Sequence, residues 1–338
     1  MKVIVDNKIP YIKGQIEKVA DEVVYLPGNA FSREEVADAD ALIVRTRTIC
    51  NRELLEGSRV KFIATATIGF DHIDVVYCQE AGIAWTNCPG CNAGSVEQYV
   101  HAALLLLKRR KGLDLNRATL GIVGVGHVGK RVKRMAEELG MRVLLNDPPR
   151  EDNGEMGFVS LQTLARESDV ITFHTPLNRE GKYKTFHLAD RKFFDSLERK
   201  PFLINSSRGE VVETGALLAA LREGKVKEAI IDTWESEPDI NLELLDNVFI
   251  GTPHIAGYSA DGKANATRMS LEALCRFMGK EAHFDVAPPS LPERTYSDDA
   301  ETAFLQLYNP MNDHDRLKSE PERFEWLRGN YPLRREFF

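Results

Sequence analysis

A glycine-rich turn between a strand pattern and a helix pattern most constrains how this chain of 338 residues can fold. The turn has the spacing Gly124-x-Gly126-x-x-Gly129. It directly follows the apolar run 118–123 and opens the segment 130–139, whose apolar residues recur at helical spacing. A strand, a tight turn and a helix in this order begin a parallel βαβ unit, so a layered α/β fold is predicted.

The same turn predicts a dinucleotide site. Its glycines let backbone N–H groups approach a pyrophosphate at the positive end of the helix, where His127 and Val128 are also expected to contact the cofactor. A second strand, 141–146, ends at Asp147. This carboxylate can accept hydrogen bonds from ribose hydroxyls and would repel a 2′-phosphate, so NAD is expected rather than NADP. Arg150 favours NADP, and a turn that binds nothing is the alternative interpretation.

Three residues farther along the chain suit the oxidation of a 2-hydroxy acid. That reaction needs a cation for the carboxylate, a base for the hydroxyl proton and an acid that orients the base. Arg208, His254 and Glu237 are predicted for these three roles in that order. Glu237 would fix the imidazole tautomer and raise the pKa of His254. Taken singly, each residue is more often structural or a surface charge.

Composition excludes several classes of protein. The chain has 44 basic and 51 acidic residues and a formal net charge of −7, which opposes non-specific nucleic-acid binding. Its longest apolar run, 102–107, is far too short to cross a membrane. Five cysteines without a regular framework favour a reducing compartment, so a cytoplasmic location is expected. Cys88 and Cys91 form a CxxC pair, which could be a redox pair or half of a zinc site. Because a thioredoxin-like context and the remaining zinc ligands are missing, a turn is preferred and no metal is expected.

Strand patterns alternate with helix patterns in two successive halves of the chain, which predicts two doubly wound parallel-sheet domains of Rossmann-like or flavodoxin-like type. The predicted strands are 2–6, 23–26, 41–45, 61–65 and 83–86 in the first half, and 120–123, 142–146, 170–173, 202–205, 229–232 and 248–251 in the second. A long helix with Ser95 as its N-cap should connect the two halves.

The helical pattern 258–278 most economically returns the chain to its first half. We therefore expect a discontinuous substrate-binding domain of residues 1–94 and 256–280, with an NAD-binding domain of residues 95–255 between its two parts. After about residue 281 the sequence becomes rich in proline and charge. Residues 281–338 are expected to form a small α+β appendage that serves dimerisation.

Five motifs in a fixed order resemble the D-2-hydroxyacid dehydrogenase family. They are the glycine-rich turn, His174-Thr175-Pro176-Leu177, Asn205-Ser206-Ser207-Arg208-Gly209, Glu237-Pro238 and Pro253-His254. The resemblance covers about residues 1–280. Segments 65–74, 253–263 and 327–337 are also similar to a branch of the family that acts on a phosphorylated hydroxy acid and dimerises through a C-terminal extension. Residues 284–338 stand in the place of that extension.

The resemblance implies a role for individual residues. Arg208, Glu237 and His254 would be the active-site residues. The residues implied at NAD, besides the glycine-rich turn, are Asp147, Thr175, Ser207, Asp232 and Gly257. The residues implied at the substrate are Thr46, Thr67 and Tyr258, and Arg45 or Arg47 could hold a phosphate next to Thr46. Each polar residue at a strand end has an alternative as an ordinary solvent-facing side chain.

Two other functions remain compatible with these motifs. One is a dehydrogenase of the same family that acts on 3-phosphoglycerate, glycerate or a lactate-like acid, and segment 65–67 with the C-terminal signature argues against it. The other is an NAD-sensing corepressor, which the acidic composition disfavours. The expected partners are a phosphorylated hydroxy acid and a second copy of the chain, with no nucleic acid and no membrane.

Overall fold

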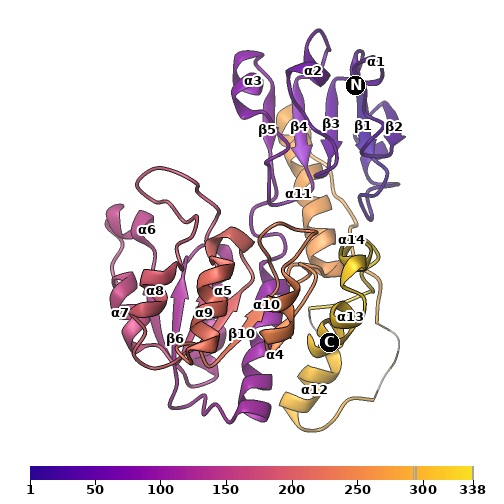
Figure 1. The fold of residues 1–338 in the computed structure, drawn as a ribbon. Coiled ribbons are helices and arrows are strands. Elements are labelled where there is room, and N and C mark those ends of the chain that lie inside the picture. The colour runs from indigo at the N-terminus through magenta and orange to yellow at the C-terminus, as the bar shows by residue number, and fades with distance from the viewer. Residues whose placement is uncertain (292, 294, 337–338) are drawn as a thin grey trace. The chain divides into compact units, whose positions relative to one another are not determined.

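The computed structural model describes residues 1–291, 293 and 295–336. Pro292, Arg294, Phe337 and Phe338 lie outside the described residues, as do the parts of the predicted C-terminal appendage and of segment 327–337 that fall on them. The chain divides into two compact units (Figure 1). The first unit consists of residues 1–92 and 259–292, and the second of residues 93–258 and 293–338.

A five-stranded parallel sheet forms the centre of the first unit, in the order β2-β1-β3-β4-β5. Its strands are β1 (Lys2–Asp6), β2 (Glu22–Leu26), β3 (Ala41–Val44), β4 (Phe62–Thr65) and β5 (Ala84–Thr86). This order is that of flavodoxin-like sheets, in which ligands bind beyond the carboxyl ends of the strands. Strands β3 and β4 are buried throughout, as expected for a parallel sheet covered on both faces.

Different helices cover the two faces of this sheet. The long helix α11 (Ala260–Met278) packs Leu271 and Leu274 against one face. The 3₁₀ helix η1 (Ile16–Lys18) lies on the same face, where Ile16 joins the same apolar cluster. The short helices on the other face are α1 (Arg33–Val36), α2 (Arg52–Leu55) and α3 (Val75–Glu80). The Ser259 hydroxyl caps α11 by accepting a hydrogen bond from the Gly262 N–H at 2.8 Å. The second part of the unit therefore completes its core.

A six-stranded parallel sheet forms the centre of the second unit, in the order β11-β10-β9-β8-β6-β7. Its strands are β6 (Thr119–Val123), β7 (Arg142–Asn146), β8 (Val170–Phe173), β9 (Phe202–Asn205), β10 (Glu228–Ile231) and β11 (Ile250–Gly251). The strand order reverses between β6 and β8, and this is where such sheets bind ligands. The predicted α/β fold with two doubly wound parallel sheets is confirmed.

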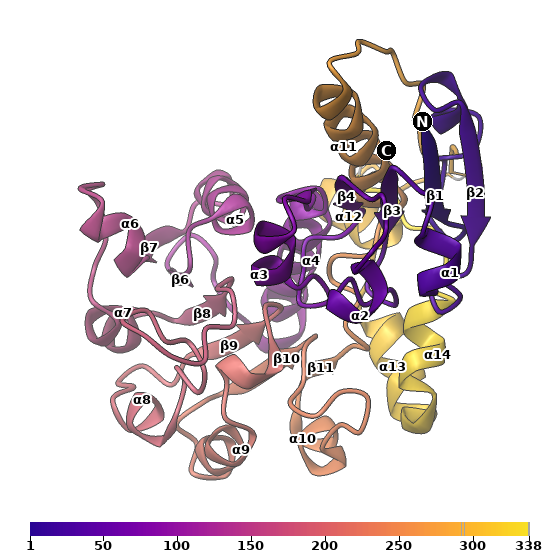
Figure 2. The ribbon, with the colours of Figure 1, turned by 90° about the horizontal axis from the view of Figure 1, so that it is seen from above.

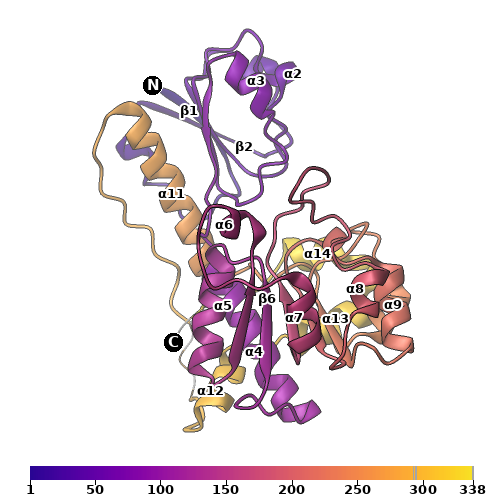
Figure 3. The same cartoon turned by 90° about the vertical axis from the view of Figure 1, so that its left-hand side faces the viewer.

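Helices also cover both faces of the second sheet, with α5 on one side of β6 and α7 on the other (Figure 3). The first face carries α4 (Ala93–Lys111) and α5 (His127–Glu138). The second carries α7 (Leu161–Glu167), α8 (Arg191–Asp195), α9 (Thr214–Arg222) and α10 (Leu242–Asn247). Two short elements, α6 (Pro148–Asp152) and η2 (Gly209–Val211), follow β7 and β9.

The start of α4 differs from the prediction. Ser95 was expected to be the N-cap, but the helix begins at Ala93 and Ser95 lies in its first turn. The Ser95 hydroxyl instead donates to Glu336 Oε1 at 2.8 Å. A Cβ at Gly94 would lie 2.1 Å from Glu336 Oε2, so the Glu336 side chain would have to shift to accommodate any larger residue there.

The C-terminal region, residues 293–336, is helical where an α+β arrangement was expected, and no strand occurs among its described residues. Its helices are α12 (Ala300–Leu307), α13 (Met311–Ser319), η3 (Pro321–Arg323) and α14 (Phe324–Gly329). Helix α13 runs beside the edge strand β11 (Figure 2). There the imidazole Nδ1 of His314 accepts a hydrogen bond from the Gly251 N–H at 3.0 Å. The region thus covers a sheet edge that would otherwise be open.

A buried arginine anchors the end of the C-terminal region in the second unit. Arg334 donates to Gln98 Oε1 at 2.7 Å, to the Ser95 carbonyl at 2.5 Å and to the Ile255 carbonyl at 3.1 Å. Its guanidinium also lies 3.6 Å from the centre of the Tyr308 ring. A buried charge needs such a full set of partners. Across the described ranges, no helix combines the length and the apolar character that a membrane crossing requires.

Candidate active site

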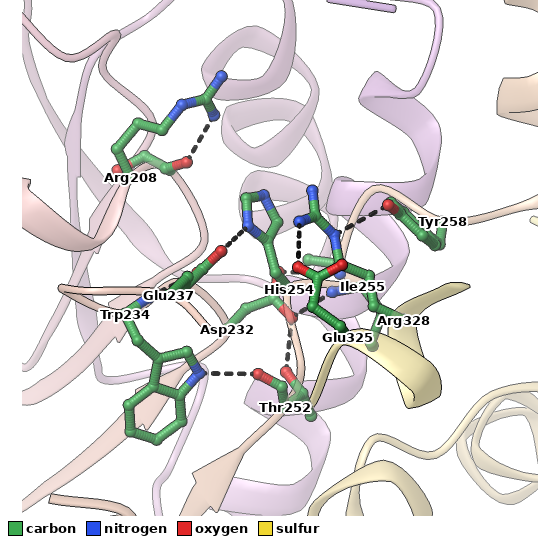
Figure 4. A network of polar contacts seen from close by, with 12 residues as sticks. Arg208, Asp232, Trp234, Glu237, Thr252, His254, Ile255, Tyr258, Glu325 and Arg328 are labelled. Atoms are coloured by element: carbon green, nitrogen blue, oxygen red, sulfur yellow. Dashed lines mark hydrogen bonds and ion pairs between the residues drawn. The ribbon is translucent and has the colours of Figure 1, made fainter. Parts of the chain in front are cut away.

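His254 and Glu237 form a hydrogen-bonded pair in the second unit (Figure 4). The His254 Nδ1 lies 2.7 Å from Glu237 Oε2, and Glu237 Oε1 accepts a hydrogen bond from the Trp234 N–H at 2.9 Å. Burial acts to raise the pKa of Glu237, but the contact with His254, the Trp234 N–H and the charge of Arg328 together hold it below its ordinary value. Glu237 is therefore ionised when it orients the imidazole.

The loop that carries His254 is held by a buried aspartate. Asp232 accepts hydrogen bonds from the Thr252 hydroxyl at 2.6 Å and from the backbone N–H groups of Ile255 and Ala256 at 2.8 and 2.9 Å. Burial raises the pKa of Asp232, although these donors and His254 act against the increase. Asp232 was expected at NAD, and the contacts that it makes here position the segment that carries His254 and Gly257.

Arg208 lies on the loop after β9. The Asn205 amide organises this loop, because its oxygen accepts from the Ser207 hydroxyl at 2.8 Å and its nitrogen donates to the Arg208 carbonyl at 2.9 Å. The Arg208 Nη1 donates to the Ser207 carbonyl at 2.8 Å. A Cβ at Gly209 would lie 1.9 Å from the Trp234 carbonyl oxygen, so the glycine after Arg208 lets this loop approach the one that leads to Glu237.

Of the three predicted catalytic residues, the structure pairs His254 with Glu237 and places Arg208 on a neighbouring loop. They follow β9, β10 and β11, which are neighbours in the sheet. Figure 4 shows Arg208 on one side of the His254 ring and Glu237 at its Nδ1. Loops at the carboxyl ends of neighbouring parallel strands are where the ligands of open α/β sheets bind.

The glycine-rich turn has the shape that a pyrophosphate site needs. Gly124 has φ 89°, and a Cβ there would lie 2.7 Å from the His174 carbonyl oxygen. A Cβ at Gly129 would lie 2.1 Å from the Gly124 carbonyl oxygen. At Gly126 it would meet no heavy atom within 4 Å. Because α5 starts at the exposed His127, its positive end faces this open position.

The residues around this turn also fit a dinucleotide. The Asp147 carboxylate accepts from the Val125 N–H at 2.7 Å, which places an acid beside the turn at the end of β7. The Thr175 hydroxyl is buried and has no hydrogen-bond partner in the part of the chain that the structure describes. Arg150 donates to the Val125 carbonyl at 2.6 Å and pairs with Glu155, so its charge is partly neutralised. This neutralisation weakens the single indication for NADP.

The substrate candidates Arg45, Thr46, Arg47 and Thr67 belong to the first unit, where they follow β3 and β4. Thr46 and Arg47 are exposed. The Arg45 Nη1 donates to the Lys8 carbonyl at 3.2 Å. The Thr67 hydroxyl donates to the Gly69 carbonyl at 2.9 Å, so this contact must be exchanged if Thr67 is to donate to a substrate.

Two functional candidates were missed by sequence reasoning. Desolvation of its ammonium group and the charge of Arg45 lower the pKa of Lys263, which marks two cations close together in the first unit. In the second unit, the Arg328 Nε donates to the Tyr258 hydroxyl at 2.9 Å. Both residues lie in segments that were recognised only as family signatures, and neither belongs to a chemical motif.

The CxxC pair lies in the first unit, where the Cys88 N–H donates a hydrogen bond to the Thr67 carbonyl at 2.9 Å. The side chains of Cys88 and Cys91 are buried and pack with Ala266 in a small apolar cluster. Burial raises the pKa of Cys88, and the Cys88 thiol lies 3.3 Å from the Ala266 carbonyl oxygen. No group of three or more potential metal ligands is found within residues 1–291, 293 and 295–336.

Comparison with known proteins agrees with this geometry. Residues 93–256 match the family described as D-isomer specific 2-hydroxyacid dehydrogenase, NAD binding domain. The erythronate-4-phosphate dehydrogenase of Bacteroides thetaiotaomicron is 61% identical over 99% of this chain and 97% of its own length. That of Escherichia coli O81 is 43% identical over 100% of this chain and 92% of its own.

A solved structure of a 2-hydroxyacid dehydrogenase has a fold similar to that of this chain. The D-lactate dehydrogenase of Aquifex aeolicus, complexed with NAD and lactic acid, superposes with a TM-score of 0.67 at 28% identity, over 86% of this chain and 100% of its own. The chain belongs to the D-2-hydroxyacid dehydrogenase family. It is an NAD-binding oxidoreductase, and its erythronate-4-phosphate dehydrogenase relatives match it over nearly its full length.

Proposed function

We propose that this chain oxidises 4-phospho-D-erythronate at C2 with NAD⁺, forming 2-oxo-3-hydroxy-4-phosphobutanoate in the biosynthesis of pyridoxal 5′-phosphate, vitamin B6. The reaction type rests on the 2.7 Å contact between His254 Nδ1 and Glu237 Oε2. The choice of substrate is supported by the 61% identity to an erythronate-4-phosphate dehydrogenase, which extends through the C-terminal region.

We assign the transfer of the C2 hydroxyl proton and the binding of the substrate carboxylate to side chains of the second unit. With Nδ1 protonated and directed at Glu237, the opposite nitrogen of His254, Nε2, is the base that takes the C2 hydroxyl proton. The resulting imidazolium is stabilised by the ionised Glu237. Arg208 pairs with the substrate carboxylate and polarises the C2 oxygen through its fixed fork of donors. When bound, NAD⁺ accepts the hydride.

The cofactor would be held along the switch point between β6 and β8. We propose that the turn Gly124–Gly129, with His127 and Val128 in its second half, surrounds the pyrophosphate and that Asp147 accepts from a ribose hydroxyl. Thr175, whose buried hydroxyl has no partner among the described residues, would gain one from the cofactor. Ser207, Asp232 and Gly257 are the remaining proposed contacts.

The distal phosphate would be held by hydroxyls and cations. Arg45 or Arg47, Thr46 and Thr67 are proposed contacts. Lys263 joins them because it lies close enough to Arg45 for that charge, together with desolvation, to lower its pKa. An anion between such cations forms charge-assisted hydrogen bonds. Residues 1–94 with 256–280 would thus serve the substrate, and residues 95–255 would serve NAD. We further propose a cytoplasmic homodimer that associates through residues 281–338.

An assay of NADH formation tests the proposal. The enzyme is offered 4-phosphoerythronate, D-erythronate, 3-phosphoglycerate and D-glycerate side by side. Loss of several charge-assisted hydrogen bonds should make D-erythronate worse than its phosphate ester by about 10²- to 10⁴-fold in kcat/KM. Preference for 3-phosphoglycerate or D-glycerate would contradict the substrate assignment, and no turnover of any acid would favour a cofactor-sensing protein instead.

A further inference from the structure

Helix α14 of the C-terminal region places a cation beside the catalytic pair. The Arg328 Nε donates a hydrogen bond to the Tyr258 hydroxyl at 2.9 Å, and its guanidinium lies 5.7 Å from the centre of the Tyr258 ring. The side chain of Arg328 is 28% exposed. In Figure 4, Arg328 and Arg208 lie on different sides of the His254 ring.

The chemistry of arginine determines how Tyr258 can act. A guanidinium has only donors, so the Tyr258 oxygen must be the acceptor in this hydrogen bond. The tyrosine hydroxyl then acts as a donor toward any further oxygen that it contacts. A hydroxyl that accepts from a cation is also a better donor, because the two hydrogen bonds polarise each other. Such a donor suits an anionic oxygen.

Two carboxylates, Glu237 and Glu325, act on the charge of Arg328 and help to raise its pKa. Its ion pair with Glu325 has 3.7 Å between Arg328 Nη1 and Glu325 Oε1. Glu325 is half exposed, and an ion pair of this length at the surface contributes little. The charge of Arg328 also acts on Glu237, whose pKa it helps to lower. The field of Arg328 therefore reaches the groups around His254.

The proposed substrate has two anionic ends, which matches the two cations. With C2 at His254 and the carboxylate at Arg208, the rest of the molecule must extend away from Arg208. We propose that Arg328 is a positioning residue for the phosphate end of the substrate, which holds Tyr258 as a donor to that phosphate. This inference rests on the proposed function. It also means that the C-terminal region contributes to the active site within its own chain.

The test compares kcat/KM for 4-phosphoerythronate and D-erythronate in Arg328→Gln, Arg328→Lys and Tyr258→Phe. Arg328→Gln should lower kcat/KM for the phosphorylated acid by about 10- to 100-fold, mainly through KM, because one charge-assisted contact loses its support. The loss of kcat/KM for D-erythronate should be clearly smaller than the loss for the phosphorylated acid, so the preference for the phosphate narrows. Arg328→Lys should recover part of the loss, since it restores the charge but not the fixed donor geometry.

Controls separate this role from folding and dimerisation. Arg316, an exposed arginine of α13 in the same region, is changed to Gln and should leave both acids unaffected. The NADH affinity and the molecular mass of Arg328→Gln should match those of the wild type. If Arg328→Gln does not fold, the kcat/KM values for the two acids are compared in Arg328→Lys and Tyr258→Phe instead. In the Tyr258→Phe background, a further change at Arg328 should cost far less than it does alone, because the two residues act as one unit.

Several outcomes would overturn the inference. Equal losses for the two acids would show that Arg328 does not serve the phosphate, and additive effects at Arg328 and Tyr258 would show that they do not act together. If the wild type instead prefers 3-phosphoglycerate, the proposed substrate is wrong, and the comparison is then decided with 3-phosphoglycerate and D-glycerate. A wild type that prefers an unphosphorylated acid contradicts the inference as well.

Discussion

At the scale of single residues, the hydrogen bonds that Glu237 makes determine which nitrogen of His254 faces the substrate. The Trp234 N–H occupies Glu237 Oε1, so the other oxygen, Oε2, is directed at His254 Nδ1. Nε2 is then the imidazole nitrogen left for the substrate. His254 itself has φ 55°, a left-handed conformation that is uncommon for a residue with a side chain. The N–H groups of the next two residues donate hydrogen bonds to the Asp232 carboxylate and so maintain this loop conformation.

Removing the imidazole should abolish most of the activity. We expect His254→Ala to lower kcat by about 10²- to 10⁴-fold, the usual contribution of a positioned proton-transfer group. His254→Asn should lose as much activity while fitting the left-handed backbone better, because Asn adopts this conformation more readily. Steady-state NADH formation measures both losses. NAD binding, followed by fluorescence titration, should stay near the wild-type value, and near-normal turnover in either variant would refute the role of His254.

The choice of cofactor should depend on Asp147. Its carboxylate accepts from the Val125 N–H and lies where a ribose hydroxyl would also reach it. Asp147→Ala should weaken NAD binding and narrow the preference for NAD over NADP, since the acid both accepts hydrogen bonds and repels a 2′-phosphate. The measurement is kcat/KM for the two cofactors in both proteins. Comparable values for NADP in the unmodified enzyme would contradict the assignment.

At the scale of secondary structure, the strands could be predicted and the C-terminal contacts could not. A strand buried on both faces of a parallel sheet is a short apolar run between polar turns, so β3 and β8 are recognisable from local sequence. Segments 304–308 and 321–327 are too short to distinguish a helix from a strand by periodicity. The partners of Arg328 and Arg334 lie far away in sequence, and no local pattern encodes such pairs.

The start of α4 is a second case in which a partner distant in sequence could not be predicted from local sequence. A serine followed by an apolar run is the usual pattern of an N-cap, and Ser95 has this pattern. Its hydroxyl is used instead by Glu336, which is 241 positions farther along the chain. Likewise, Arg208, Glu237 and His254 could be predicted because family motifs mark them. Lys263 could not, since its significance lies in its proximity to Arg45.

A buried acid makes the stability of the C-terminal helices depend on pH. Burial raises the pKa of Asp313 to about 6, although the Tyr331 hydroxyl, at 2.9 Å, and the charge of Arg334 act against the increase. The folded chain therefore binds this proton more tightly than the unfolded chain does. The resulting stabilisation is fully present below the unfolded pKa near 3.8 and is lost as the pH rises through about 6.

Asp313→Asn removes this dependence. Between pH 5 and pH 8 the free energy of unfolding of the wild type should fall by about 1 kcal/mol more than that of the variant. Relative to the wild type, the variant should therefore be more stable at pH 8 than it is at pH 5. Urea unfolding at the two pH values measures the difference, and comparing the two proteins cancels the other titrating groups. A difference that is the same at both pH values would show that Asp313 titrates normally.

At the scale of the whole molecule, the C-terminal region is both part of a core and a proposed interface. Tyr308 packs with α4 and β6 in one apolar cluster, while Leu317 and Phe324 pack with the helices of the other face. Deleting residues after His283 would therefore expose apolar surface in the second unit. We expect this truncated chain to be monomeric or aggregated, and a soluble truncated dimer would place the interface elsewhere.

Because truncation alters folding and assembly together, point changes on the exposed surface test dimerisation more directly. Trp326 and Leu333 are 52% and 46% exposed, unusually large apolar surfaces for a region with a packed core. If the C-terminal region forms the dimer contact, Trp326→Ser with Leu333→Ser should shift the enzyme toward monomers at micromolar concentration, because apolar residues at the centre of an interface supply most of its affinity. Sedimentation velocity over a concentration series measures the shift.

Met156, which is 94% exposed in the second unit, provides the control, since Met156→Ser should leave the mass unchanged. An unaltered dimer in the double variant would remove these residues from the interface, and a monomer that keeps its turnover would show that the active site is complete within one chain.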